Sequence, residues 1–97
     1  MANKPKQTPG SEILLEAHKL VNGPRQNDYG HPADDYSKVA DIFETFTGIQ
    51  LTVPEAILFM VAVKMARLRT NLDKDVVHHD SLLDAIGYLA CLNMAVN

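Results

Sequence analysis

The chain has 97 residues, of which 46% are hydrophobic and 22% charged, which is typical of one globular domain and excludes whole-chain disorder. Nine basic and twelve acidic residues give a net charge of −3, which argues against a partner that is a nucleic acid polymer. No apolar run is long enough to predict a membrane span, and the polar N-terminus does not resemble a signal peptide. Together with a lone cysteine, Cys91, these features predict a cytoplasmic protein.

The chain opens with a polar segment, residues 1–10, whose two prolines and one glycine predict a flexible arm. Residues 11–97 are then expected to form one all-α domain. Four segments in it place apolar residues at helical spacing, and none alternates as a half-buried strand does. Ser11 is expected to cap the first helix. Gly23 occupies the usual place just after a helix and is expected to end it.

A loop and a second helix follow. Residues 22–33 hold two glycines and two prolines, which predicts a loop. Pro32 suits the first turn of the second helix, which is expected to end at Gly48. Thr52 and Glu55 are then spaced as in a capping box, and this pattern predicts the start of a third helix.

The third helix, residues 53–70, is apolar on almost every side in its first half, since residues 56–63 include no polar side chain. Such a helix is usually buried all round, and a four-helix monomer of this size offers little interior for it. We therefore expect a homo-oligomer, with a dimer as the simplest closed assembly. The fourth helix is expected to begin at its cap, Asp80, and to run to about Ala95.

The loop before the second helix holds side chains suited to a nucleotide. Arg25 offers a planar set of donors that fits phosphate, and Tyr29 could stack on a base. Gly30 permits a positive φ angle or the close approach of a ligand. His31 lies where the second helix begins, and helix N-termini favour anions. The alternative is a tight loop whose tyrosine packs on the core.

A second group of polar residues lies on the third and fourth helices. Lys64 and Arg67 share a helix face and could hold a phosphate, or they could extend into solvent or pair with aspartates. Asp80, Asp84 and Tyr88 follow one stripe of the fourth helix. The two carboxylates could bind Mg²⁺ or Mn²⁺. Alternatively, Asp80 is a cap, and Asp84, set between apolar neighbours, pairs with a cation of the third helix.

Two stretches, residues 13–43 and 57–92, resemble small phage-encoded MazG-like proteins, which are divergent relatives of the all-α nucleotide pyrophosphohydrolase superfamily. The most specific parts are R-x-x-x-Y-G-x-P, which starts at Arg25, and D-x-x-G-Y, which starts at Asp84. The resemblance implies a four-helix MazG-like bundle completed by oligomerisation. It also implies that active members use E-x-x-E and E-x-x-D motifs to hold Mg²⁺ and split a nucleoside triphosphate into monophosphate and pyrophosphate.

This chain departs from the superfamily pattern at the metal site. Lys64 and Arg67 stand where E-x-x-E is expected, and Ser81 stands where E-x-x-D begins. Only Asp84 matches, with Asp80 as a displaced substitute. Cations repel a metal but attract the phosphates that a metal would bridge. The departure therefore favours nucleotide binding with lost or altered hydrolysis.

Three functions are therefore carried forward, and none assigns a catalytic residue. The first is a phage nucleotide-binding protein without a cofactor, which could sequester a host defence signal of the cyclic nucleotide or ADP-ribose type. Its candidate binding residues are Arg25, Tyr29, Gly30, His31, Lys64, Arg67 and Tyr88. The second is a nucleoside triphosphate pyrophosphohydrolase whose Mg²⁺ or Mn²⁺ is held by Asp80 and Asp84. The third is a helical oligomer that binds a protein and no nucleotide.

Overall fold

The computed structural model describes residues 10–23 and 28–97, which form α-helices and no strand. The helices are α1 (Glu12–Asn22), α3 (Pro32–Thr47), α4 (Val53–Leu72) and α5 (His79–Val96). The all-α prediction is therefore confirmed. Two predictions lie outside the described residues: the flexible arm, apart from Gly10, and the site residue Arg25.

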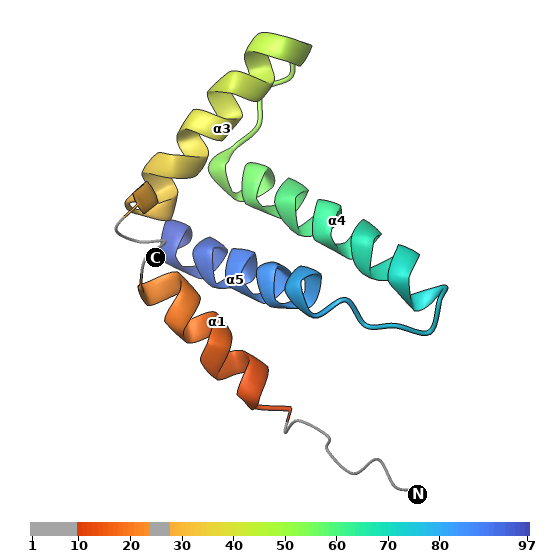
Figure 1. The fold of residues 1–97 in the computed structure, drawn as a ribbon. Helices are drawn as coiled ribbons and strands as arrows, with labels where there is room; N and C mark the ends of the chain where they lie inside the picture. Colours follow the sequence, from red (N-terminus) through yellow and green to blue (C-terminus); the bar gives the residue numbers. More distant parts are fainter. Residues whose placement is uncertain (1–9, 24–27) are drawn as a thin grey trace, which may run out of the picture.

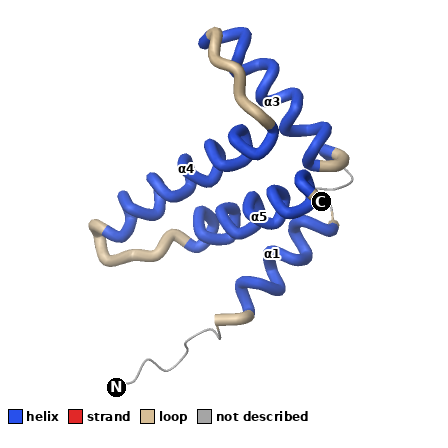
Figure 2. The backbone as a smooth tube through the Cα atoms, turned by 180° about the vertical axis from the view of Figure 1, so that it is seen from behind, coloured by secondary structure: helices blue, strands red, loops and turns tan. Residues whose placement is uncertain are grey.

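Helices α4 and α5 form an antiparallel pair at the centre of the molecule, and α1 packs along another side of α5 (Figure 1). The same arrangement is seen from behind in Figure 2. Helix α3 leaves this layer at an angle. Its first half packs on α4 and α5, where Tyr36 and Ala40 join Ala56, Ile57 and Cys91 in the buried core. The second half of α3 extends beyond the other helices (Figure 1).

The predicted end of α3 at Gly48 and the predicted capping box at the start of α4 are both confirmed. Gly48 follows α3 with a φ of 75°, and its amide donates to the Glu44 carbonyl oxygen over 2.8 Å. At the start of α4 the Glu55 amide donates to the Thr52 hydroxyl oxygen, and the Thr52 amide donates to the Glu55 carboxylate. That second bond is the main reason why the pKa of Glu55 lies below its ordinary value. The capping box therefore forms as its sequence pattern predicts.

The predicted cap of the last helix is wrong. Helix α5 begins at His79, and His78 is its N-cap, because the Nδ1 atom of His78 accepts the backbone amide of Ser81 over 3.3 Å. An imidazole nitrogen can accept this amide as a carboxylate would, so Asp80 lies inside the first turn instead of capping it. The cap expected at Ser11 is also wrong in its chemistry, since Ser11 precedes α1 but its side chain makes no capping bond.

The predicted loop before α3 is shorter than expected. Asn22 still belongs to α1, and the backbone of Asp28 and Tyr29 is helical. The third predicted helix also extends two residues further, to Leu72. The differences at Asn22 and Leu72 lie at helix ends, whose bounds are the least sharply defined part of a helix.

The first half of α4 is not buried on all sides within one copy of the chain. Ala56 and Ile57 are fully buried, but Leu58 and Phe59 remain about half exposed. Within one chain α5 and α3 cover only part of α4. Burial on all sides would therefore need a second chain, as the sequence predicts, and this burial stays a prediction. Among the described helices, none is both long and apolar enough to cross a membrane.

Candidate functional site

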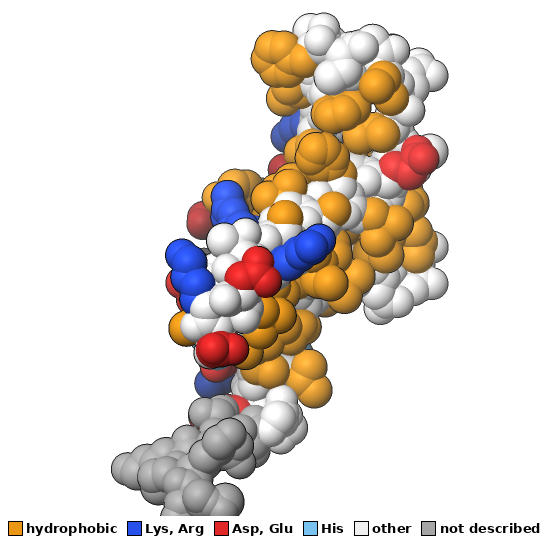
Figure 3. Space-filling view, turned by 90° about the vertical axis from the view of Figure 1, so that its right-hand side faces the viewer, with side chains coloured by type: hydrophobic (Ala, Val, Ile, Leu, Met, Phe, Trp, Pro, Cys, Tyr) orange, Lys and Arg blue, Asp and Glu red, His pale blue; other side chains and the backbone are white. Residues whose placement is uncertain are grey.

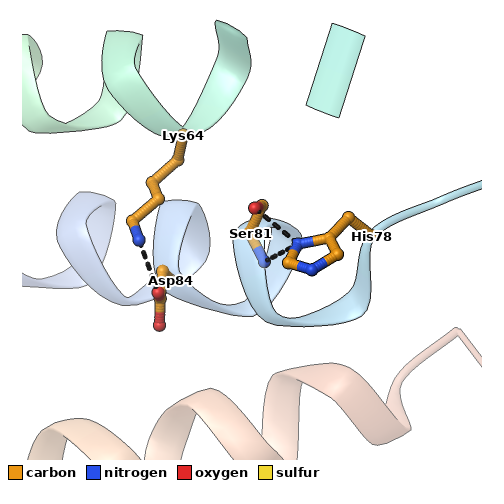
Figure 4. A network of polar contacts seen from close by, with 4 residues as sticks. All are labelled: Lys64, His78, Ser81 and Asp84. Atoms are coloured by element: carbon orange, nitrogen blue, oxygen red, sulfur yellow. Dashed lines mark hydrogen bonds and ion pairs between the residues drawn. The ribbon is translucent and has the colours of Figure 1, made fainter. Parts of the chain in front are cut away.

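An ion pair joins the two central helices. The Lys64 Nζ atom reaches from α4 to within 2.9 Å of the Asp84 Oδ2 atom on α5 (Figure 4). The Lys64 side chain is only 13% exposed and the Asp84 side chain 36%, so water screens the pair less than it would at an open surface. The carboxylate of Asp84 thus has the cationic partner that its apolar neighbours required. The sequence left two cations open for this role, and the structure selects Lys64.

Arg67 faces a different place, a hollow where the end of α4 meets the start of α5. The hollow measures about 490 Å³ and is lined by Ala66, Arg67, Thr70 and Asn71 from α4 and by His78 and Ser81 from α5. Within the described part of the chain Arg67 makes no ion pair. Arg67 therefore places a cationic group at the wall of this hollow. The volume of the hollow lies within the range of roughly 300–1,000 Å³ that small-molecule sites occupy.

A buried serine and a histidine form the α5 side of this hollow. The Ser81 Oγ atom lies 2.7 Å from His78 Nδ1 (Figure 4). Since Nδ1 also accepts the Ser81 amide, the hydroxyl is the donor of this bond in that tautomer. The His78 ring is thereby fixed at the N-terminus of α5, next to backbone amides that favour an anion. Neither residue is among the ligand contacts predicted from the sequence, where Ser81 stands out only as the position at which E-x-x-D would begin.

A second, smaller hollow of about 150 Å³ is lined by Leu20 of α1 and by Asp84, Gly87 and Tyr88 of α5. The Tyr88 ring meets the buried Tyr36 ring edge to face, with 6.2 Å between their centroids. This contact connects Tyr88 to the core beneath α3. The volume of this smaller hollow lies below the roughly 300 Å³ at which small-molecule sites usually begin.

The residues of the predicted loop site lie elsewhere. His31 is the N-cap of α3, and its Nδ1 atom accepts the Ala33 amide over 3.1 Å. Gly30 has a φ of 75°, the left-handed conformation that glycine adopts without strain. Neither of the two hollows is lined by these residues or by Tyr29. The positions described for this loop therefore do not converge with Arg67 in one site.

The described residues do not assemble a metal site. They contain no group of three or more histidine, cysteine, aspartate or glutamate side chains that could hold an ion. Of the two predicted ligands, Asp84 already neutralises Lys64, and Asp80 lies exposed in the first turn of α5. An ammonium group in contact with a carboxylate competes directly with a divalent cation. The geometry does not fit Mg²⁺ or Mn²⁺, and no chemical step is assigned to either.

One further polar contact joins α1 to α5 and had no signal in the sequence. The His79 Nε2 atom lies 3.0 Å from the Glu16 Oε2 atom. The hydrogen bond to Glu16, and then the charge of that carboxylate, raise the pKa of His79 above its usual value. The two residues are 63 positions apart in the sequence, so only helix packing brings them together.

Comparison with known proteins gives a family without an assigned role. The family described as Domain of unknown function (DUF6378) matches residues 12–95. The Gene 55 protein of Mycobacterium phage D29 is 30% identical over 80 residues, which are 82% of this chain and 50% of that protein. The Gene 55 protein of Mycobacterium phage L5 is 28% identical over 81 residues, with 82% and 49% covered. The chain thus spans about half the length of these phage relatives, and no solved structure matches it.

Proposed function

Since this chain belongs to the DUF6378 family, whose function is unknown, we propose a function from the geometry of its site: the protein binds a nucleotide and does not hydrolyse it. The observation that carries the proposal is the hollow between α4 and α5. It combines the cation of Arg67, which makes no ion pair among the described residues, with the polar groups of Thr70, Asn71, His78 and Ser81.

The hollow suits a phosphate group more than a neutral ligand. A guanidinium binds phosphate through two parallel hydrogen bonds, which are among the strongest in proteins. The first turn of α5 adds backbone amides with no acceptor inside the helix. The Asn71 and Thr70 side chains already donate to carbonyl oxygens of α4, at Arg67 and Ala66. They are therefore held in place at the wall, where they can accept hydrogen bonds from a sugar or a base.

The absence of hydrolysis in this proposal follows from the Lys64–Asp84 pair. Superfamily-type hydrolysis needs a carboxylate that is available to a metal, and Asp84 contacts an ammonium group instead. Breaking this half-buried pair to load a metal would cost part of its stabilisation. The alternative function, a metal-dependent nucleoside triphosphate pyrophosphohydrolase that uses Asp80 and Asp84, requires this rearrangement.

Binding without turnover amounts to sequestration. Together with the phage relatives, this leads us to extend the proposal to a host nucleotide signal of the cyclic nucleotide or ADP-ribose type. Both classes carry the phosphates that Arg67 would contact. The 490 Å³ hollow can hold one nucleotide unit, so the remaining part of a larger ligand would lie outside it.

One incubation tests this proposal. The protein, in molar excess, is mixed with nucleoside triphosphates, cyclic dinucleotides and ADP-ribose derivatives, with and without Mg²⁺ or Mn²⁺. After filtration the retained protein is denatured, and both fractions are chromatographed. The proposal predicts that one compound leaves the filtrate and is recovered intact from the denatured protein, with no metal required.

Two results would overturn the proposal. Release of monophosphate and pyrophosphate would establish the hydrolase instead, provided that an Asp84→Asn variant fails to release them. Recovery of every compound in the filtrate would leave no nucleotide function and would favour the third hypothesis, a helical oligomer that binds a protein.

A further inference from the structure

Large apolar side chains of α3, of α4 and of the turn between them are exposed to solvent. Phe46 is 83% exposed, which is rare for an aromatic side chain in a folded domain. Its neighbours are also about half exposed or more. The group, here called the α3–α4 face, consists of Ile42, Phe46, Ile49, Leu58, Phe59 and Met65.

A ring contact connects the two helices that carry this face. The Phe43 and Phe59 rings meet edge to face, with 5.5 Å between their centroids. Phe46 lies one helical turn beyond Phe43. Leu58 and Met65 lie two turns apart on the same side of α4, since a separation of seven residues returns to the same face. In Figure 3 hydrophobic side chains are exposed over the upper part of the molecule and continue down its middle and right, whereas most of the lysine, arginine and acidic side chains lie at the lower left.

The face is large for a monomer. Six large side chains, each about half exposed or more, present on the order of 600 Å² of apolar surface. The largest apolar patch on a typical monomer covers about 300–600 Å². The core of an interface is about 65% apolar. If the 600 Å² are the apolar part of such an interface, the whole interface would bury roughly 900 Å² on each copy. A stable interface of standard size needs about 800 Å² per partner.

We propose that a second copy of this chain covers the α3–α4 face, with the same face of each copy packed against the other about a two-fold axis. A two-fold interface must be self-complementary. A face built from apolar side chains meets this condition, because none of its six members carries a charge. The segment of α4 that carries Leu58 and Phe59 has no polar residue from 56 to 63. In the dimer this segment is buried on both sides, by α5 of its own copy and by the second copy.

The proposed dimer also gives the second half of α3 a packing partner. Ile42 and Phe46 are largely exposed and contribute little to the core of their own chain. Both belong to the second half of α3, and that half extends beyond the other helices (Figure 1). Most of the stability of a helix in a protein comes from packing of its apolar side, so the second half of α3 is poorly stabilised when nothing packs on it. Contact with a second copy supplies the missing burial.

The molar mass in solution tests the proposal, measured by sedimentation equilibrium over a range of concentrations and without nucleotide. Phe46→Glu is the main variant, because this side chain is too exposed for its loss to unfold one chain. Leu58→Glu tests the α4 side in the same way. Leu15→Glu is the matched control, since Leu15 is 60% exposed but lies on α1, outside the face. Circular dichroism checks that each variant keeps its helices.

The expected result is a dimer for the parent chain and for Leu15→Glu. Phe46→Glu should raise the dissociation constant by at least about 30-fold, the effect of losing a central interface residue. The proposal would be overturned if the parent chain had the molar mass of a monomer at every concentration measured, including the highest at which it stays in solution. A dissociation constant for Phe46→Glu that equals the value of the parent chain would also overturn it. Neither result depends on whether a nucleotide binds, so the two proposals can fail separately.

Discussion

Lys64 on α4 and Asp84 on α5 hold the two central helices together through an ion pair of 2.9 Å. Asp84 lines the smaller hollow, and Arg67, three residues after Lys64 on α4, lines the larger one. The effect of the ion pair is to keep the Asp84 carboxylate away from other partners and to leave Arg67 as the cation at the wall of the larger hollow.

Removing the lysine should destabilise the fold measurably. Lys64→Met keeps the length of the side chain but leaves Asp84 half buried without a counter-charge. We expect the free energy of unfolding to fall by roughly 1–3 kcal/mol, between the small effect of exposed pairs and the larger effect of buried ones. Urea unfolding at a fixed protein concentration measures this change.

A double-mutant cycle separates the pair from other effects of the lysine. In a chain that already carries Lys64→Met, Asp84→Asn should lower the free energy of unfolding by about 1 kcal/mol less than it does in the parent chain. Lys38→Met is the control, because Lys38 is exposed on α3 and makes no ion pair within the described residues. Strict additivity of the two changes at positions 64 and 84 would contradict a stabilising pair.

Charge reversal at Arg67 should weaken nucleotide binding. Arg67→Glu removes charge-assisted hydrogen bonds and adds repulsion, so affinity for the compound retained in the filtration assay should fall at least about 10-fold. Arg69→Glu is a matched control. It changes the net charge equally and lies on the same helix, but Arg69 does not line the hollow. Equal loss of affinity in both variants would point to a general charge effect, and titration calorimetry distinguishes the two cases.

The contact between α1 and α5 should depend on pH. The pKa of His79 is raised in the folded chain, mainly by the hydrogen bond to Glu16 and with a smaller contribution from Asp80. A raised pKa means that the stabilisation is fully present below the unfolded-state pKa, about 6.5, and is lost as the pH rises through the folded-state value. Glu16→Gln should therefore destabilise the chain more at pH 5.5 than at pH 8.5.

Urea unfolding at the two pH values measures this difference. Glu12→Gln, also on α1, should destabilise the chain equally at both, since nothing in the structure joins Glu12 to a histidine. A Glu16→Gln effect that is the same at pH 5.5 and pH 8.5 would show that the pair does not form in solution.

Replacement of Gly87 and of Gly48 by alanine should change the free energy of unfolding in opposite directions. At Gly87, inside α5, an added Cβ would meet Val21 and Leu20 at 3.8 and 3.9 Å, which is ordinary van der Waals contact. Gly87→Ala should therefore stabilise the chain by roughly 0.5–1 kcal/mol, the usual gain inside a helix. Gly48 has a positive φ of 75°, so Gly48→Ala should destabilise it by about 1 kcal/mol.

Thermal or urea unfolding of the two variants checks both signs. A destabilising Gly87→Ala would mean that α1 lies closer to α5 than in this structure. Because Gly87 also lines the smaller hollow, any loss of nucleotide affinity in a stabilised Gly87→Ala variant would connect that hollow to the ligand.

Features set by neighbouring residues could be predicted from the sequence. The capping box of Thr52 and Glu55, the helix end at Gly48 and the four helical segments all depend on residues within about one turn of one another. The need of Asp84 for a cation was also predictable, because its neighbours in α5 are apolar. The resemblance to MazG-like proteins pointed correctly to phage-related small proteins, and its nucleotide chemistry stays a prediction.

Only the tertiary structure decided which distant groups meet. It paired Asp84 with Lys64 and placed Arg67 in a hollow with Ser81. It also brought Glu16 to His79 across 63 residues. The angles at which helices pack decide such contacts, and they depend on the summed fit of many side chains. The same reason applies to the first half of α4. A sequence shows that a segment is apolar all round, but only the packing of the helices shows which side is left for a partner.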